Sequence, residues 1–168
     1  MFNRALILIS LIAAPLVATA QEAPTQEVVE KFDAWSKICV TNSDQEKPPC
    51  QIVQSATQNA TGSVVFQTAV GYIADNDKPL MFMTAPLGIF LPKGITVVVD
   101  DDEQGLTVPV QRCDAKGCLA VLVMERDFVR KLERGDGARA IFAANAERNV
   151  ALPIDLTGFR KAFRSVRP

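Results

Sequence analysis

Cysteine is the residue type with the clearest chemistry in this 168-residue chain, which has four cysteines and no histidine. Without histidine the chain has no Ser-His-Asp or Cys-His nucleophile system, no histidine base and no histidine-containing metal site. The serine-nucleophile motif Ser-x-x-Lys is absent from the sequence too. These absences predict a protein that is not an enzyme, with no catalytic residues, no cofactor and no bound metal.

The four cysteines, Cys39, Cys50, Cys113 and Cys118, allow three disulfide pairings. We favour Cys39–Cys50 and Cys113–Cys118, because the partners in each pair are close in sequence and flank residues typical of turns. Zinc coordination by thiolates and thiol redox chemistry are the alternatives. The spacings Cys-x10-Cys and Cys-x4-Cys resemble neither the usual Cys-x2-Cys zinc knuckle nor the Cys-x-x-Cys of an oxidoreductase.

The first twenty residues have the pattern of a secretory signal peptide. Arg4 precedes an apolar run over residues 5–17, and the small residues Ala18 and Ala20 flank Thr19. The run is shorter than the roughly 18 apolar residues that a membrane-spanning helix needs. We therefore expect cleavage after Ala20 and a mature protein that is periplasmic, associated with the outer envelope or secreted, which is also where disulfides are expected.

The mature chain fits one domain of ordinary size. We expect a signal peptide over 1–20, a flexible mature N-terminus over 21–31 and one domain over 32–168. Loss of Arg4 reduces the 18 Lys and Arg to 17 against 19 Asp and Glu, which gives a formal charge of −2. This balance gives no sign of nucleic-acid binding, and the mature chain has no second hydrophobic span.

Short β-rich segments separated by turn residues predict an all-β protein with two short helices, arranged as an antiparallel sandwich. Apolar residues at helical spacing predict a helix over 125–134, with Gly135 as its left-handed C-terminal cap, and a second helix beginning at Phe159. The expected strands cover residues 32–40, 51–57, 63–74, 80–84, 95–99, 106–112, 119–124, 138–144 and 149–154.

The terminal helix places Arg160, Lys161 and Arg164 away from its apolar stripe, with Arg167 just beyond. A basic helix face of this kind can contact anionic lipid or a polyanionic glycan, so these three residues are candidate interaction residues. The simpler interpretation, which we favour, is a solvated face whose cations are placed favourably near a helix C-terminus.

The acidic run over residues 100–103 is a candidate calcium ligand set, but a solvated hairpin turn explains it more simply. The single tryptophan, Trp35, lies beside the first expected disulfide. We expect it to be buried, as single tryptophans in β-sandwiches usually are.

An ordered set of short motifs runs from Phe32 to Val166, over nearly the whole mature chain. It comprises Phe32-Asp33-Ala34-Trp35, Cys39, Cys50-Gln51-Ile52-Val53-Gln54, Pro86-Leu87-Gly88, Leu91-Pro92-Lys93-Gly94-Ile95, Cys113-x4-Cys118, Val150-Ala151-Leu152-Pro153 and Leu156-x-Gly158-Phe159 followed by Ala162. This set resembles the invasion-associated locus B family. Ala34 departs from the Gly-Asp-Trp pattern of that family.

The resemblance implies an immunoglobulin-like β-sandwich exported by an alphaproteobacterium, with no enzymatic activity attached to it. The family takes its name from a role in the entry of a pathogen into erythrocytes, yet many members belong to free-living bacteria, so that role need not transfer.

We therefore expect an exported, non-enzymatic interaction protein of the bacterial envelope that contributes to host-cell invasion or surface association. Its partner would be an unidentified envelope or host-surface protein. One alternative is a structural envelope protein that forms homo-oligomers through its sheet edges. The other is a glycan-acting enzyme that uses two carboxylates, since such chemistry needs no histidine.

Overall fold

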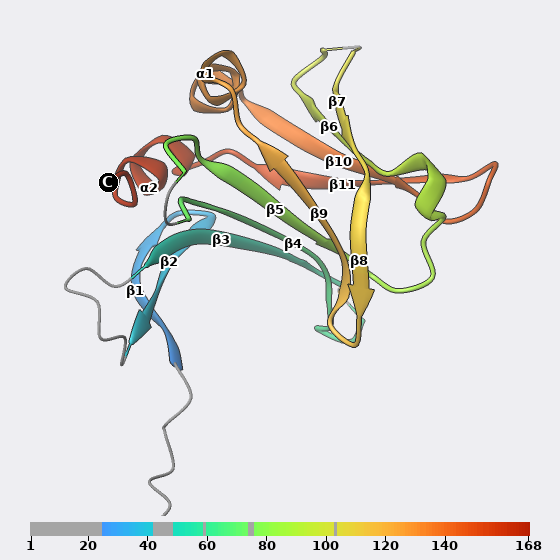
Figure 1. The fold of residues 1–168 in the computed structure, drawn as a ribbon, viewed down its shortest axis with the longest axis horizontal. Coiled ribbons are helices and arrows are strands. Elements are labelled where there is room, and N and C mark those ends of the chain that lie inside the picture. Colours follow the sequence, from blue (N-terminus) through green and yellow to red (C-terminus); the bar gives the residue numbers. More distant parts are fainter. Residues whose placement is uncertain (1–24, 42–48, 59, 74–75, 103) are drawn as a thin grey trace, which may run out of the picture.

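The computed structural model describes residues 25–41, 49–58, 60–73, 76–102 and 104–168. Two antiparallel sheets form its body, and two short helices close one end (Figure 1). The larger sheet has the order β1 (Thr25–Phe32), β2 (Trp35–Thr41), β3 (Cys50–Thr57), β4 (Val64–Gly71), β5 (Leu80–Ala85), β9 (Gly117–Val123) and β8 (Val110–Asp114). The smaller sheet has the order β11 (Asn149–Asp155), β10 (Gly137–Ala143), β6 (Ile95–Val99) and β7 (Leu106–Val108).

The helices are α1 (Arg126–Arg134) and α2 (Phe159–Arg164), and a short 3-10 turn, η1, covers Leu91–Lys93. The predicted all-β sandwich with two short helices is therefore confirmed. No helix in the described part of the chain combines the length and the apolar character needed to cross a bilayer.

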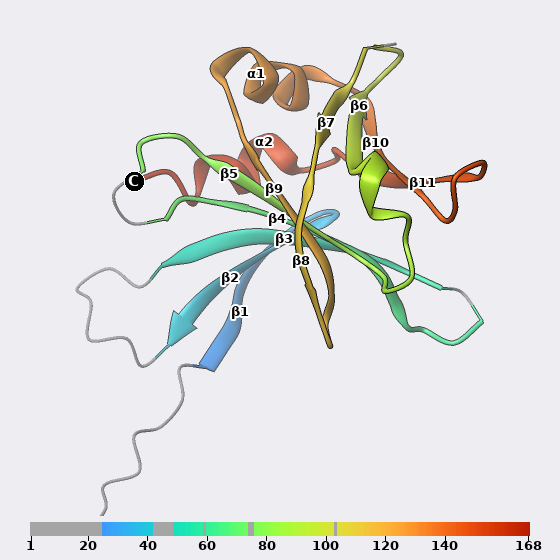
Figure 2. The ribbon, with the colours of Figure 1, turned by 45° about the vertical axis from the view of Figure 1, so that its right-hand side comes forward.

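The core forms between the two sheets because alternate residues of each strand point inward. In β6 the inward residues are Ile95 and Val97, both fully buried, and in β10 the fully buried Ala140 lies opposite Val97. Met81 and Met83 of β5 supply the facing layer from the larger sheet. Figures 1 and 2 show that the smaller sheet and both helices lie on the same side of the larger sheet.

One expected strand, over residues 106–112, is divided between the two sheets. Its first part, β7, pairs with β6, and its second part, β8, pairs with β9 in the larger sheet. Pro109 stands between the two parts, where it interrupts the strand because proline has no backbone N–H to donate to a ladder. The chain thus crosses from one sheet to the other at Pro109.

The expected flexible N-terminus over 21–31 is wrong from Thr25 onward, because Thr25–Phe32 forms strand β1 along β2. A two-residue turn joins these strands, with Asp33 at a φ of 51° and Phe32 opposite Trp35. Seven of the eight residues of β1 are exposed, so the strand lacks the apolar alternation that would have identified it. Backbone pairing with β2 holds it in place.

Gly135 follows α1 as expected, but it is not a left-handed cap. Its φ is −69° and its ψ is 153°, and its N–H donates to the carbonyl of Lys131. A Cβ at this position would lie 2.9 Å from Cγ1 of Val99 and 3.0 Å from Oδ2 of Asp100. The close approach of β6 is therefore the reason for glycine at this position.

Candidate interaction site at the C-terminal helix

Helix α2 is held to the sandwich by its aromatic face. Phe159 and Phe163 are 0% and 1% exposed, and their rings stack on each other with centroids 5.6 Å apart. The Phe159 ring meets the buried Trp35 edge to face at 5.2 Å. This stack confirms that Trp35 is a core residue, and it holds helix α2 against the sandwich.

Hydrogen bonds between the sheets hold the segment that leads into α2. The indole N–H of Trp35 donates to the carbonyl of Asp155 over 2.8 Å. The side chain of Gln54 donates to the same carbonyl and accepts from the Asp155 N–H, both at 2.8 Å. The side chain and the backbone N–H of Thr157 bind the Asp155 carboxylate, and these hydrogen bonds lower its pKa. The larger sheet, β11 and α2 therefore form one rigid corner.

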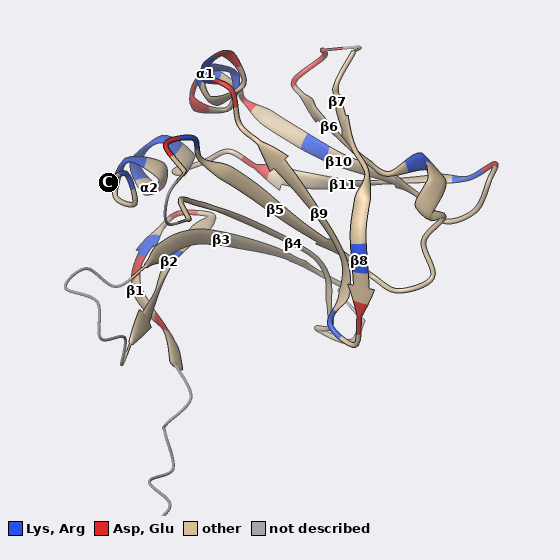
Figure 3. Cartoon of the chain, in the orientation of Figure 1, with Lys and Arg blue, Asp and Glu red and all other residues tan. Residues whose placement is uncertain are grey.

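The predicted basic face is present on this helix. Arg160, Lys161 and Arg164 are all exposed, and no ion pair involves them within the described residues. In Figure 3 the ribbon of α2 near the C-terminus is coloured blue at its Lys and Arg positions. Lys37 of β2 adds a cation at the end of the helix, where its Nζ donates to the carbonyl of Ser165 over 2.9 Å. The three candidate residues thus form one basic face on a fixed support.

A cleft of about 710 Å³ opens between α1, α2 and the loop before β5. Its floor is apolar and aromatic, and it includes Tyr72, whose ring stacks on Phe163 at 6.1 Å. Its rim is charged and electrically balanced. The lining residues are Tyr72, Asp77, Lys78, Pro79, Met124, Glu125, Arg126, Asp127, Val129, Arg130, Glu133, Phe163 and Arg167.

Arg167 links the basic helix to this cleft. Its guanidinium carbon lies 4.8 Å from the centroid of the Phe163 ring, and its Nη2 lies 2.9 Å from Oε1 of Glu133 on α1. Burial raises the pKa of Tyr72 nearby, and the Arg167 charge partly opposes that shift. This group could not be recognised from the sequence, because residues 72, 133 and 167 share no motif or spacing.

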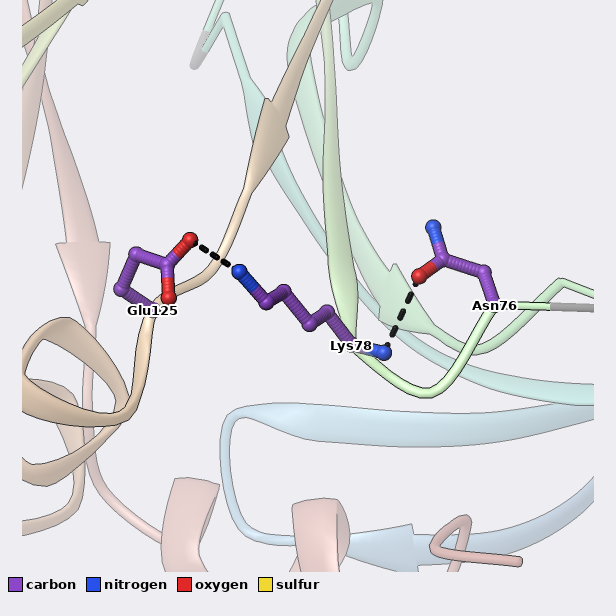
Figure 4. A network of polar contacts seen from close by, with 3 residues as sticks. All are labelled: Asn76, Lys78 and Glu125. Atoms are coloured by element: carbon purple, nitrogen blue, oxygen red, sulfur yellow. Dashed lines mark hydrogen bonds and ion pairs between the residues drawn. The ribbon is translucent and has the colours of Figure 1, made fainter.

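The opposite rim of the cleft joins the start of β5 to the start of α1. Figure 4 shows Lys78 between two partners: its Nζ is 2.6 Å from Oε1 of Glu125, and its backbone N–H donates to Oδ1 of Asn76 over 3.0 Å. Arg130 pairs with Asp127 on α1 itself. An apolar floor inside a balanced charged rim suits a polar chain that carries an apolar group.

Both disulfides favoured by the sequence occur in the structure. Cys39 and Cys50 lie opposite each other on β2 and β3, with an S–S distance of 2.05 Å, and Cys113 and Cys118 do so on β8 and β9, at 2.07 Å. Each bond therefore closes a hairpin of the larger sheet.

In the acidic turn after β6, Asp100 and Asp102 contact other parts of the protein, and Glu103 lies outside the described residues. Oδ1 of Asp100 accepts from the backbone N–H groups of Asp136 and Gly137, and Asp102 pairs with Lys131 of α1. That hydrogen bond from Lys131 is the main reason that the pKa of Asp102 is lowered. Across the described ranges, no group of three or more acidic or cysteine side chains is placed to hold a metal ion.

Comparisons of the sequence and of the structure with known proteins match this chain to the same family. The sequence model of the family described as "Invasion associated locus B (IalB) protein" matches residues 35–167. Invasion protein B of Bartonella bacilliformis is 24% identical over 162 residues, which cover 89% of this chain and 80% of that protein. The crystal structure of invasion associated protein B from Bartonella henselae superposes with a TM-score of 0.69, at 24% identity, over 82% of this chain and 92% of that one.

Proposed function

Because this chain belongs to the invasion associated locus B family, we propose that it is an exported, non-enzymatic interaction protein of the bacterial envelope that takes part in surface association or host-cell invasion. Two disulfides and an apparent signal peptide support export, since such bonds persist in oxidising compartments. The relatives named for invasion support the association with host cells.

The observation that carries the binding proposal is the basic face of α2. Arg160, Lys161 and Arg164 project from a helix that the Trp35–Phe159–Phe163 stack holds rigidly. A rigid support keeps the entropic cost of ordering these side chains against a partner low. The chemistry fits an acidic patch on an envelope or host-surface protein. The cleft lies next to this face, because Arg167 just beyond α2 lines the cleft and pairs there with Glu133.

A direct binding measurement tests this proposal. Labelled mature protein, residues 21–168, would be titrated onto intact erythrocytes and onto bacterial envelope preparations at several salt concentrations. We expect saturable binding to at least one surface, weakened by salt because exposed charges are screened. Changing Arg160, Lys161 and Arg164 together to serine should weaken binding about tenfold or more, at roughly 1.4 kcal/mol per tenfold.

The matched control changes three exposed cations elsewhere, Lys116, Arg134 and Arg148, to serine. Both triple variants lose the same charge, so a loss confined to the α2 variant identifies the site and excludes a general effect of net charge. Binding that is equal in the wild-type protein and the α2 variant would rule out the basic face as the contact. An absence of saturable binding to both surfaces would contradict the proposed function.

Export has its own test. Intact-mass measurement of the protein recovered from the producing cells should give a chain that begins at Gln21 and has lost four hydrogens to two disulfides. A chain that retains Met1 and is found in the cytosol would contradict export.

A further inference from the structure

An apolar pocket lies at the end of the sandwich away from helix α2. Its volume is about 480 Å³, within the range of about 300–1,000 Å³ that is usual for small-molecule sites. Figures 1 and 2 show the turns that surround it, between β3 and β4, between β5 and η1, and between β10 and β11. Strand β11 begins beside the pocket and ends where the chain leads into α2, so the pocket is separate from the basic face.

The lining of this pocket is uncharged. None of the eleven described residues that line it is Asp, Glu, Lys or Arg, and most of them are aliphatic or aromatic. Phe142 is buried at its base, where its ring stacks on Phe66 of the larger sheet with centroids 6.1 Å apart. At the rim, Leu87 in the motif Pro86-Leu87-Gly88 is 58% exposed. A concave, uncharged lining with an exposed leucine at its rim indicates a site for an apolar ligand.

Hydrogen bonds within the protein hold the walls of this pocket in place. The backbone N–H of Phe90 donates to the carbonyl of Ala143 over 2.8 Å, which joins the loop after β5 to the end of β10. The Nζ of Lys93 donates to the carbonyl of Ala146 over 2.6 Å, which joins η1 to the β10–β11 turn. The pocket is therefore formed before a ligand arrives, and this lowers the ordering cost of binding.

A peptide would find few backbone partners around this pocket. In each surrounding turn, one backbone N–H donates to a carbonyl of the protein itself, and these donors belong to Gln58, Phe90 and Ala144. The nearby edge strand β11 is poorly suited to an added strand, because Pro153 has no N–H and the Gln54 side chain bonds both backbone groups of Asp155. A hydrocarbon chain needs no hydrogen bond along its length, so it fits this site better than a peptide does.

Two cations flank the pocket, on η1 and on the β10–β11 turn. Lys93 and Arg148 pair with no carboxylate in the described parts of the chain. Glu147 is the only acid in residues 86–95 and 143–150, so two cations and one acid give these two segments a net charge of +1. This charge suits a single anionic headgroup beside the apolar lining.

We propose that this pocket binds the fatty acyl chain of an anionic amphiphile, whose headgroup lies beside Lys93 and Arg148. Burial of the chain against the uncharged lining supplies most of the affinity, because every methylene removed from water contributes favourably. The two cations set the orientation of the chain. This activity does not depend on the contact proposed for α2, because the two sites share no residue.

Calorimetric titration of the full mature protein with sodium dodecanoate tests the proposal. We expect one site per chain, and an affinity that rises about fourfold with each methylene added between octanoate and dodecanoate. Dodecanol has the same chain without a charge and should bind several-fold more weakly. Changing Lys93 and Arg148 together to serine should remove this difference between the acid and the alcohol.

Two substitutions address the pocket itself. Leu87→Ser removes apolar surface from the rim and should weaken dodecanoate binding about tenfold, and Ala144→Phe fills the pocket and should abolish binding. The matched control, Leu106→Ser, changes a leucine of β7 that is 42% exposed and lies outside the pocket, so binding should not change. Thermal unfolding of Leu87→Ser should match the wild-type protein within a few degrees, which separates a lost site from a lost fold.

Vesicles of phosphatidylglycerol distinguish two sources of the chain. Binding of the wild-type protein to these vesicles, lost in Leu87→Ser, would identify a membrane lipid as the ligand. Binding to dodecanoate alone would identify a free fatty acid. An affinity that does not change with chain length, equal binding by the wild-type protein and both pocket variants, or no binding to either probe would each overturn the proposal.

Discussion

The guanidinium of Arg167 lies over the ring of Phe163 at 4.8 Å while its Nη2 is 2.9 Å from Oε1 of Glu133. A single side chain near the C-terminus therefore fastens α2 to α1. The Glu133 side chain is only 14% exposed, so this pair is less screened by solvent than a surface ion pair. The pair closes one side of the cleft between the helices.

Removing this fastening should cost more than removing the exposed pair on the opposite rim. We expect Arg167→Ala to destabilise the protein by about 1–2 kcal/mol, since it loses both the ion pair and the cation–π contact. Lys78→Ala, in the pair whose side chains are 54% and 65% exposed, should cost no more than about 0.5 kcal/mol. Urea unfolding measures both, and a double-mutant cycle with Glu133→Ala should give a coupling of about 1 kcal/mol. A coupling near zero would contradict the fastening.

Tyr72 should make the protein less stable at high pH. Burial raises the pKa of Tyr72, so the native state holds its proton more tightly than the unfolded state does. The stability that this shift contributes is complete below pH about 10, the pKa of tyrosine in the unfolded chain. It is lost as the pH rises through the raised pKa of Tyr72 in the folded state. Tyr72 is the only tyrosine in the sequence, so near-ultraviolet absorbance titrates it directly. Tyr72→Phe should flatten the fall in unfolding free energy above pH about 10; an unchanged slope would refute the assignment.

Substitution on the buried face of α2 should destabilise the protein strongly, whereas substitution on its exposed face should leave stability almost unchanged. Phe159→Ala should destabilise by about 3–5 kcal/mol, because it empties a fully buried site beside Trp35. Changing Arg160, Lys161 and Arg164 to serine should change stability by no more than about 0.5 kcal/mol. Trp35 is the only tryptophan, so its fluorescence follows the docking of the helix. Loss of helix docking in the serine variant would show that the basic face has a structural role.

The first disulfide should stabilise the protein more than the second. Cys39 and Cys50 are separated by 11 residues, whereas Cys113 and Cys118 are separated by 5. In the chain-entropy account the two loops contribute roughly 3 and 2 kcal/mol. Replacing each pair with alanines and measuring thermal unfolding compares them. The reverse order would show that loop entropy does not decide the relative contributions of the two bonds.

Two glycines with a similar positive φ allow the cost of backbone strain to be separated from the cost of a close contact. Gly158, at a φ of 81°, precedes α2, and an added Cβ would overlap the carbonyl oxygen of Phe32. Gly88, at 88°, has open space around that position. Gly88→Ala should cost about 1 kcal/mol from strain alone, and Gly158→Ala should cost about 2 kcal/mol or more. Equal losses of unfolding free energy for the two variants would show that the backbone at Phe32 shifts to make room for the added Cβ at position 158.

The sequence by itself predicted the fold class, most strands of the core, both helices and the favoured pairing of cysteines, because apolar periodicity and loop length are local properties. The basic face of α2 was also predictable, since it follows from helical spacing. Strand β1 was not, because seven of its eight residues are solvent-exposed and its position depends mainly on pairing with β2.

Tertiary structure decided the features that depend on distant residues. It brought Tyr72, Glu133 and Arg167 together at one cleft, and it moved the chain between sheets at Pro109. It also explains Gly135, because the side chains of Val99 and Asp100 approach this position so closely that a Cβ would crowd them. Which face of the uncharged strands β3, β4, β5 and β9 meets the core is likewise a matter of register and packing, because alternation in a strand defines two faces without saying what lies against either.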